Sequence, residues 1–241
     1  MQEPLVLLPG ALCDARVFGP QLAALSPEMA LTVAPITRGE RIEEIASGLL
    51  DVLPRRFALL GSALGGNVAM ELLRRAPDRV TRIALMSANA LAETPQSSAD
   101  LEPLIIKARA GRVSEVVDGM IGPDCLAPGA SRGEVKALVR DMAEHLGAET
   151  IHRQLKAMQR RRDYQVALRR CKVPALVLCG EHDGVTPIKR NSFLADLIPY
   201  GDFEVTEGAG HFPMLEQPDA TTEALRVWLR KPLVLRSPVE A

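Results

Sequence analysis

The sequence predicts a doubly wound, mainly parallel α/β sheet that carries a helical insertion. Short, continuous apolar runs end at glycine or proline, which is typical of strands buried on both faces of a parallel sheet. Amphipathic helical patterns alternate with several of these runs, as in doubly wound folds. One long block, residues 88–170, has helical periodicity and no convincing buried strand. We therefore expect a core from residues 1–87 and 171–230, the helical block between them, and an irregular tail over residues 231–241.

The expected strands are short and follow one another along the whole chain. The first run, LVLL, stops at a Pro-Gly pair, and the third, FALL, stops at a glycine. The expected strands cover residues 5–8, 31–34, 57–60, 82–87, 175–179 and 203–206. The helices expected around them cover residues 16–25, 42–52, 67–75 and 220–229.

The helical block is expected to form a lid over the ends of the strands. Pro123, Pro128 and several glycines would separate its helices. Most of its apolar stripes are expected to pack against neighbouring helices. Some must face the cavity beneath, and Met120 and Met158 are candidates to line it with adaptable side chains.

Composition limits the classes of function. The 241 residues fit one large domain or two small ones, and 47% of them are hydrophobic, so the chain can bury a substantial core. A net charge of -1 gives no general attraction to nucleic acid or to anionic membranes. No apolar run reaches the roughly 18 residues of a membrane span. A small-molecule partner is therefore expected.

The N-terminus and the cysteines favour a reducing compartment. The first expected strand begins at Leu5, which leaves no room for a signal peptide. The four cysteines are widely spaced, with no C-x-x-C pair and no Cys/His cluster at metal-ligand spacing. We therefore expect a cytoplasmic protein without a metal site, in which Cys171 and Cys179 are small core residues.

Residues 61–66, GSALGG, match a nucleophile elbow that lacks its nucleophile. In the pattern G-x-S-x-G, the central serine lies on a sharp turn between a strand and a helix. Here the glycines are in place and Ala63 stands at the centre. Such a central residue has a strained backbone with φ > 0, and the glycines remove Cβ atoms that would collide where strand and helix meet. Taken alone, the motif also fits an ordinary strand-to-helix turn.

Two later loops supply an acid and a histidine. Asp183 follows the apolar run at 175–179, at the edge of the sheet where functional residues gather. Its alternative role is to cap the helix that begins near Pro187. His211 follows the last expected strand, behind a glycine-rich turn. A lone histidine is usually structural or solvated, but this setting and the other two motifs favour function. The histidines that lack this setting are His145, His152 and His182.

The order of the three positions along the chain is the Ser…Asp/Glu…His order of α/β-hydrolases. On these motifs the chain resembles the α/β-hydrolase superfamily, specifically its lidded esterase branch. Residues 7–18 are similar to the oxyanion segment of that branch, with Pro9-Gly10 where its members more often have His-Gly. Residues 180–187 and 208–218 also match. The resemblance covers nearly the whole chain, is weakest in the helical block, and departs from the family at Ala63.

This resemblance implies an acyl-transfer site that needs no cofactor and no metal. A serine at position 63 would attack an acyl carbonyl, His211 would take its proton and pass it to the leaving group, and Asp183 would orient the imidazole. Backbone N–H groups of Ala11 and Leu64 would bind the oxyanion. The implied partner is a small acyl substrate, and ester, thioester, lactone and carbon–carbon cleavage all fit these residues. Oligomeric state has no signal in the sequence.

Ala63 leaves two interpretations, because alanine cannot form an acyl-enzyme. The chain is either an inactivated Ser-to-Ala form of a working hydrolase, of the kind made to trap a substrate, or a natural non-hydrolytic relative. Such a relative would bind a ligand, or would use the His211–Asp183 pair for proton transfer as cofactor-free lyases and oxygenases do. We favour the first, because the histidine, acid, glycines and oxyanion segment are intact. Dehalogenase and epoxide hydrolase chemistry would need an aspartate at the elbow.

A basic run near the end of the helical block, Arg160 to Arg162, has two explanations. A solvated helix face is the one we favour. The alternative is contact with a carboxylate or phosphate of the substrate, for which Arg161 and Arg162 are the candidates. Aromatic residues make up only 3% of the chain, so no stacking platform for sugars or bases is expected.

Overall fold

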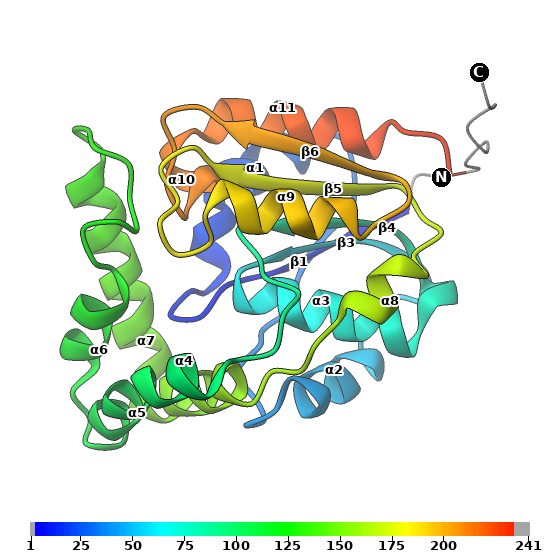
Figure 1. Cartoon of the computed structure of the whole chain (residues 1–241). Helices are drawn as coiled ribbons and strands as arrows, with labels where there is room; N and C mark the ends of the chain where they lie inside the picture. The colour runs from blue at the N-terminus through cyan, green and yellow to red at the C-terminus, as the bar shows by residue number, and fades with distance from the viewer. Residues whose placement is uncertain (1–2, 234–241) are drawn as a thin grey trace.

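The computed structural model describes residues 3–233, and its centre is a six-stranded parallel sheet. The strand order is β2-β1-β3-β4-β5-β6 (Figure 1). The predicted doubly wound α/β fold is confirmed. The strands are β1 Leu5–Leu8, β2 Leu31–Val33, β3 Phe57–Ser62, β4 Val80–Met86, β5 Ala175–Gly180 and β6 Gly201–Thr206. Residues 234–241, most of the tail expected over 231–241, lie outside the described residues.

The four inner strands are buried along their whole length, as their continuous apolar runs predict. In β1, Leu5 and Leu7 join one apolar cluster while Val6 and Leu8 join another, because successive side chains point to opposite faces of a sheet. Both faces of the sheet therefore need a covering layer.

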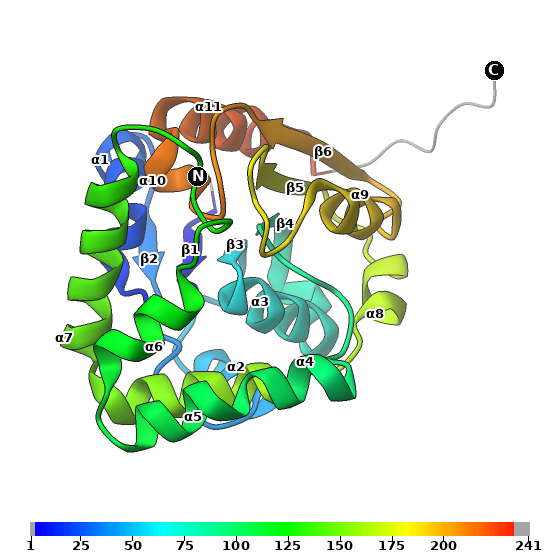
Figure 2. The same ribbon diagram turned by 60° about the vertical axis from the view of Figure 1, so that its left-hand side comes forward.

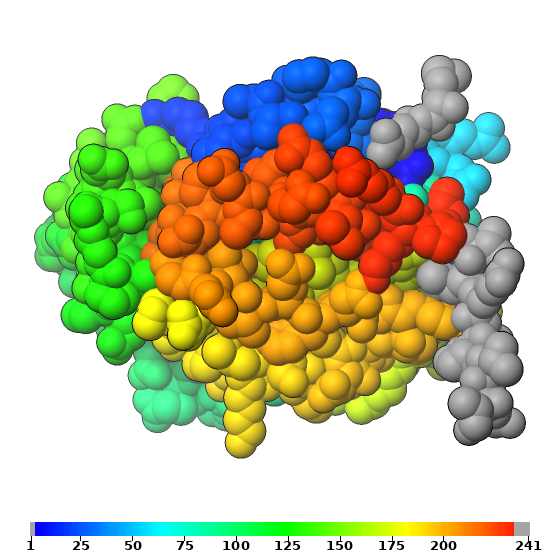
Figure 3. Space-filling model, turned by 90° about the horizontal axis from the view of Figure 1, so that it is seen from above, coloured from blue at the N-terminus to red at the C-terminus, as the bar shows by residue number. Residues whose placement is uncertain are grey.

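Helices supply a layer on each face. On the face of Val6 and Leu8 lie α2 Ile42–Leu50, α3 Leu64–Arg75 and α9 Ile188–Asp196. On the opposite face lie α1 Gly19–Leu25 and α11 Pro218–Leu229, which are side by side in Figure 3. The shorter turns are η1 Ala15–Phe18, η2 Pro77–Arg79 and α10 Pro213–Glu216. The single helix expected over residues 16–25 is split into η1 and α1, because a proline stands in the first turn of α1.

Between β4 and β5 the described chain forms helices and no strand. They are α4 Pro95–Asp100, α5 Glu102–Arg109, α6 Val113–Met120, α7 Arg132–Gln159 and α8 Gln165–Arg169. α5 and α6 pack on α7, and the three stand beyond the carboxyl ends of the strands (Figures 1 and 2). α7 bends at Gly147, where φ is 78°. α8 packs on α3 instead, so the end of the 88–170 block lies on the core.

Over residues 3–233, no helix has the length and apolar character that crossing a bilayer requires. The four cysteines are buried and free.

Candidate active site

The turn between β3 and α3 has the backbone of a nucleophile elbow. Ala63 lies between them with φ 48° and ψ -113°, a conformation that costs a residue with a side chain about 1–3 kcal/mol. Backbone hydrogen bonds hold it there, since its N–H donates to the Met86 carbonyl at 2.9 Å and its carbonyl accepts from the Asn67 N–H at 3.2 Å. Ala63 therefore sits on a sharp turn at the carboxyl end of β3, in the pocket that also contains His211.

Two glycines let this turn form against the neighbouring backbone. A Cβ atom on Gly61 would lie 2.3 Å from the carbonyl oxygen of Gly65. One on Gly65 would lie 2.2 Å from the carbonyl oxygen of Leu8, at the end of β1. No side chain fits at either distance, so α3 can start this close to the sheet only with glycine at both positions.

We expect Gly65→Ala to lower the free energy of unfolding by about 3 kcal/mol or more, because backbone has to move to admit the methyl group. Chemical denaturation followed by circular dichroism measures the change. Gly48→Ala is the matched control: it lies inside α2, and a Cβ there meets nothing within 4 Å. It is expected to stabilise the protein by about 0.5–1 kcal/mol. Equal stabilities for the two variants would contradict the close approach at Gly65.

The acid and the histidine come together from the loops after β5 and β6. Nδ1 of His211 lies 3.0 Å from both carboxylate oxygens of Asp183. The Asp183 side chain is fully buried and also accepts hydrogen bonds from Thr186, through its N–H at 2.8 Å and its hydroxyl at 2.7 Å. Burial alone would raise the pKa of Asp183, but the hydrogen bonds and charge of His211, with the Thr186 donors, hold it below its ordinary value.

Because the pKa of Asp183 is lowered in the folded state, its contribution to the free energy of unfolding depends on pH. A carboxyl group whose pKa is lower in the folded state stabilises the fold above its unfolded pKa of about 3.9 and loses that effect as the pH falls through the folded value. We expect the stability difference between the native chain and Asp183→Asn to be full at pH 7 and to shrink below about pH 4. Urea unfolding at a series of pH values measures it. A difference that stays constant to pH 3 would contradict this assignment.

The loop that carries the histidine is fixed by its surroundings. The His211 N–H donates to the Cys125 carbonyl at 2.7 Å. Glu216 accepts from the N–H of Phe212 at 3.0 Å and from the N–H of Ala127 at 2.7 Å. Glu216 therefore ties the histidine loop to the segment before α7, and it acts as a structural partner of that loop.

The two residues expected to supply oxyanion amides, Ala11 and Leu64, lie in the same pocket as Ala63. α3 begins at Leu64, and the first amides of a helix have no acceptor within it. Ala11 lies on the turn after β1, and both residues line the pocket that contains Ala63 and His211. The turn at Ala11 is supported from α7, because Gln154 accepts a hydrogen bond from the Leu12 N–H at 3.1 Å.

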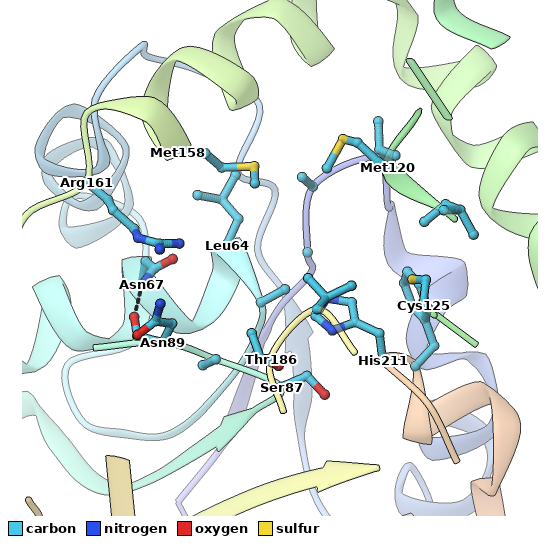
Figure 4. Close-up of a pocket in the computed structure, with 18 residues that line it drawn as sticks. Leu64, Asn67, Ser87, Asn89, Met120, Cys125, Met158, Arg161, Thr186 and His211 are labelled. Atoms are coloured by element: carbon cyan, nitrogen blue, oxygen red, sulfur yellow. Dashed lines mark hydrogen bonds between the residues drawn. The ribbon is translucent and has the colours of Figure 1, made fainter. Parts of the chain in front are cut away.

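The pocket over Ala63 is small and mainly apolar. Its volume is about 90 Å³, which holds roughly six to nine atoms of the size of a water molecule. Figure 4 shows His211 and Thr186 at one end, with Arg161, Asn67 and Asn89 at the other. The sequence-predicted residues that line it are Ala11, Ala63, Leu64, Met120, Met158, Arg161 and His211. Asp183 lies behind His211 and reaches the pocket through the imidazole.

A family model described as "Alpha/beta hydrolase family" matches residues 5–224. The chain belongs to the alpha/beta hydrolase family. This hydrolase-family chain is 26% identical to the pimeloyl-[acyl-carrier protein] methyl ester esterase of Pectobacterium carotovorum, over 91% of each protein. It is 29% identical over 198 residues to an uncharacterized protein of Mycobacterium tuberculosis, of whose length the match spans 57%.

Solved structures of alpha/beta hydrolases superpose on nearly the whole chain. A thermophilic esterase from Thermogutta terrifontis, with malate bound, has a TM-score of 0.85 and covers 95% of this chain and 89% of its own. The enol-lactonase from Burkholderia xenovorans LB400 has a TM-score of 0.84 and covers 96% of this chain and 92% of its own. Each is 26% identical in sequence.

One candidate substrate-binding residue, Arg162, is not brought to this pocket by the structure. Its guanidinium lies 3.7 Å from the Glu43 carboxylate, and its side chain is 49% exposed. The reason is that α7 ends at Gln159, and the irregular turn that follows directs neighbouring arginines to different places. Arg162 is a solvated surface residue, which agrees with the explanation that we favour for residues 160–162.

Two buried polar residues, one in the pocket and one beside it, were not predicted from the sequence. Asn67 sits on α3, where its side-chain N–H donates to the Asn89 carbonyl at 2.8 Å. Gln154 is 1% exposed and joins the turn after β1 to α7. Asn67 could have been found from the sequence, because it is a polar amide on an otherwise apolar helix face. Gln154 had none, because its partner Leu12 lies far away in the sequence.

Proposed function

We propose that this pocket is the site of a carboxylic ester hydrolase of the Ser-His-Asp type, from which a Ser-to-Ala replacement at position 63 has removed the nucleophile. The observation that carries the proposal is the elbow backbone of Ala63 (φ 48°) in one pocket with His211, whose Nδ1 lies 3.0 Å from Asp183. The relatives named as esterases and as an enol-lactonase support ester chemistry. In this proposal α4 to α7 form the lid, since Met120 and Met158 reach the pocket from α6 and α7.

The chemistry follows from the placement of these groups. A serine hydroxyl at position 63 would attack the acyl carbon while Nε2 of His211 takes its proton, and Asp183 would stabilise the imidazolium at Nδ1. The carbonyl oxygen becomes an oxyanion, which the N–H groups of Leu64 and Ala11 would bind; each such donor contributes about 3 kcal/mol in the transition state. The alcohol then leaves with the proton from His211. Water releases the acid by the same path.

Cys125 does not substitute for the missing hydroxyl. Its side chain lines the pocket, but burial and the nearby charge of Asp183 raise the pKa of this thiol to about 12. The thiol therefore stays protonated at neutral pH, and the thiolate is the reactive form of cysteine. With Ala63 in place, the chain binds a small acyl substrate and releases it without forming an acyl-enzyme.

The test is Ala63→Ser, assayed with short-chain p-nitrophenyl esters. The chain with Ala63 is expected to be inactive, and the serine form is expected to release p-nitrophenol with saturation kinetics. A folded A63S protein that turns over none of these esters would contradict it.

A second candidate is proton transfer by the chain as it stands. It is favoured by the His211–Asp183 pair, which is complete beside Ala63 and can act as a base without a covalent step. Oxygen uptake with a quinolone-like substrate compares the native chain with His211→Ala. Uptake that disappears in the variant would support this function, and no uptake by the native chain would reject it.

A further inference from the structure

The pocket over Ala63 has one charged wall. Most residues that line it are apolar, and Arg161 is the one among the described lining residues with a permanent charge. Its side chain is only 14% exposed. Figure 4 shows its guanidinium directed toward Asn67, on the side of the pocket away from His211. A buried guanidinium at the end of an apolar pocket needs an acceptor, and its partners identify what it can still bind.

The protein engages only part of this guanidinium. Nε donates to the Leu91 carbonyl at 3.0 Å, and Nη2 lies 2.7 Å from the Glu93 carboxylate. Within residues 3–233, no hydrogen bond is found for Nη1. Glu93 and the Leu91 carbonyl thus engage one edge of the planar Arg161 guanidinium. The N–H donors of Nη1, on the other edge, remain available.

Asn89 adds a second donor beside it. Its side-chain oxygen accepts from the Leu91 N–H at 3.1 Å, and its carbonyl accepts from the side-chain N–H of Asn67 at 2.8 Å. The side-chain N–H2 of Asn89 has no partner among the described residues. The capacity that remains on Arg161 and Asn89 consists of N–H donors, and the side-chain oxygen of Asn67 is the one acceptor beside them with no hydrogen bond among the described residues. A carboxylate, which only accepts hydrogen bonds, is the small group that matches such a set.

The helix sets the distance from this end to the reacting position. Ala63 immediately precedes α3 and Asn67 lies in its first turn, and residues one helical turn apart have Cβ atoms about 5–6 Å from each other. The small volume of the pocket, about 90 Å³, also limits the acyl group to a few carbons.

We propose that Arg161 and Asn89 bind a free carboxylate of the substrate, so that the substrate is the half-ester of a short dicarboxylic acid. The ester carbonyl lies at Ala63 and the distal carboxylate lies at Arg161. This inference rests on the proposed ester chemistry and adds the substrate class to it.

Binding to the native chain tests the inference without turnover. Isothermal titration calorimetry compares monomethyl succinate with methyl 4-methylpentanoate, in which an uncharged isopropyl group with the same number of heavy atoms replaces the carboxylate. The half-ester is expected to bind ten- to a hundredfold more tightly, as a hydrogen-bonded charge does. Arg161→Met is expected to abolish this preference, with a much smaller effect on the neutral ester than on the half-ester. Arg160→Met is the matched control, since Arg160 pairs with Glu40 at 3.2 Å outside the pocket.

Two milder variants keep the test decisive if Arg161→Met does not fold. Arg161→Lys retains the positive charge but lacks the planar set of N–H donors. It is expected to lose most of the preference for the half-ester. Glu93→Gln removes the competing carboxylate and is expected to tighten the half-ester several-fold with no change for the neutral ester. Equal binding of the two esters by the native chain, or equal effects of the variants on both, would overturn the inference.

The outcomes separate this inference from the proposed function. If A63S hydrolyses neutral esters while Arg161→Met changes both esters alike, the hydrolase stands and the carboxylate site is wrong. If A63S is inactive on every ester while half-ester binding still depends on Arg161, the carboxylate site stands and the hydrolase is wrong.

Discussion

Ala63→Ser is expected to raise kcat/KM for p-nitrophenyl butyrate by about 10⁴-fold or more over the native chain. Loss of the nucleophile from an intact Ser-His-Asp site costs about 10⁶ in rate, and the remaining oxyanion donors retain only a small part of the catalysis. The added oxygen has room, because glycine stands opposite: a Cβ on Gly10 would lie 3.4 Å from the Ala63 Cβ. The elbow backbone already has the required φ of 48°. Steady-state kinetics on both proteins measure the gain.

The neighbouring serine supplies the control for this prediction. Ser62 is the last residue of β3, is buried, and does not line the pocket. Ser62→Ala in the A63S protein is therefore expected to leave kcat largely unchanged. If Ser62→Ala instead removed the activity gained by A63S, the nucleophile would have been assigned to the wrong position.

His211→Ala in the A63S protein is expected to lower kcat by about 10⁴- to 10⁶-fold, back to the level of the native chain. The hydroxyl needs a base, and His211 is the histidine that lines the pocket with Ala63. Its Nδ1 is held at 3.0 Å by Asp183, which directs the other ring nitrogen away from the acid. Stopped-flow or plate-reader assays at pH 7 to 8 measure the loss.

A second histidine provides a matched control for this loss. His182 lies next to Asp183 in the chain, but its side chain is 43% exposed and it does not line the pocket. His182→Ala is expected to retain activity. A large loss with His182→Ala, or none with His211→Ala, would show that the imidazole in use is not the one paired with Asp183.

The parts of the fold that are local in sequence were predictable. β1, β3 and β5 are continuous apolar runs that stop at Pro or Gly, and each was located within a residue or two of its observed ends. The elbow was readable because Gly61 and Gly65 are needed wherever a helix starts this close to a strand. These signals depend on neighbours in the chain, so the sequence carries them directly.

The walls of the pocket were not predictable in the same way. Arg161 and Arg162 are adjacent and chemically identical, yet one is buried against Glu93 and the other is exposed near Glu43. Which of them turns inward depends on where α7 ends and on the Leu91 carbonyl that receives Nε of Arg161. Such contacts form between segments distant in the chain, and no periodicity or motif encodes them.

Covalent labelling of the A63S protein shows whether a hydroxyl at position 63 lies within reach of a working base. The protein is incubated with a fluorophosphonate ester, and its intact mass is measured before the modified peptide is sequenced. We predict one phosphonyl adduct at position 63 in A63S, no adduct in the native chain, and strongly slowed labelling when His211→Ala is added. A folded A63S protein that stays unlabelled, or that is labelled elsewhere, would contradict the assignment of this pocket as a hydrolase site.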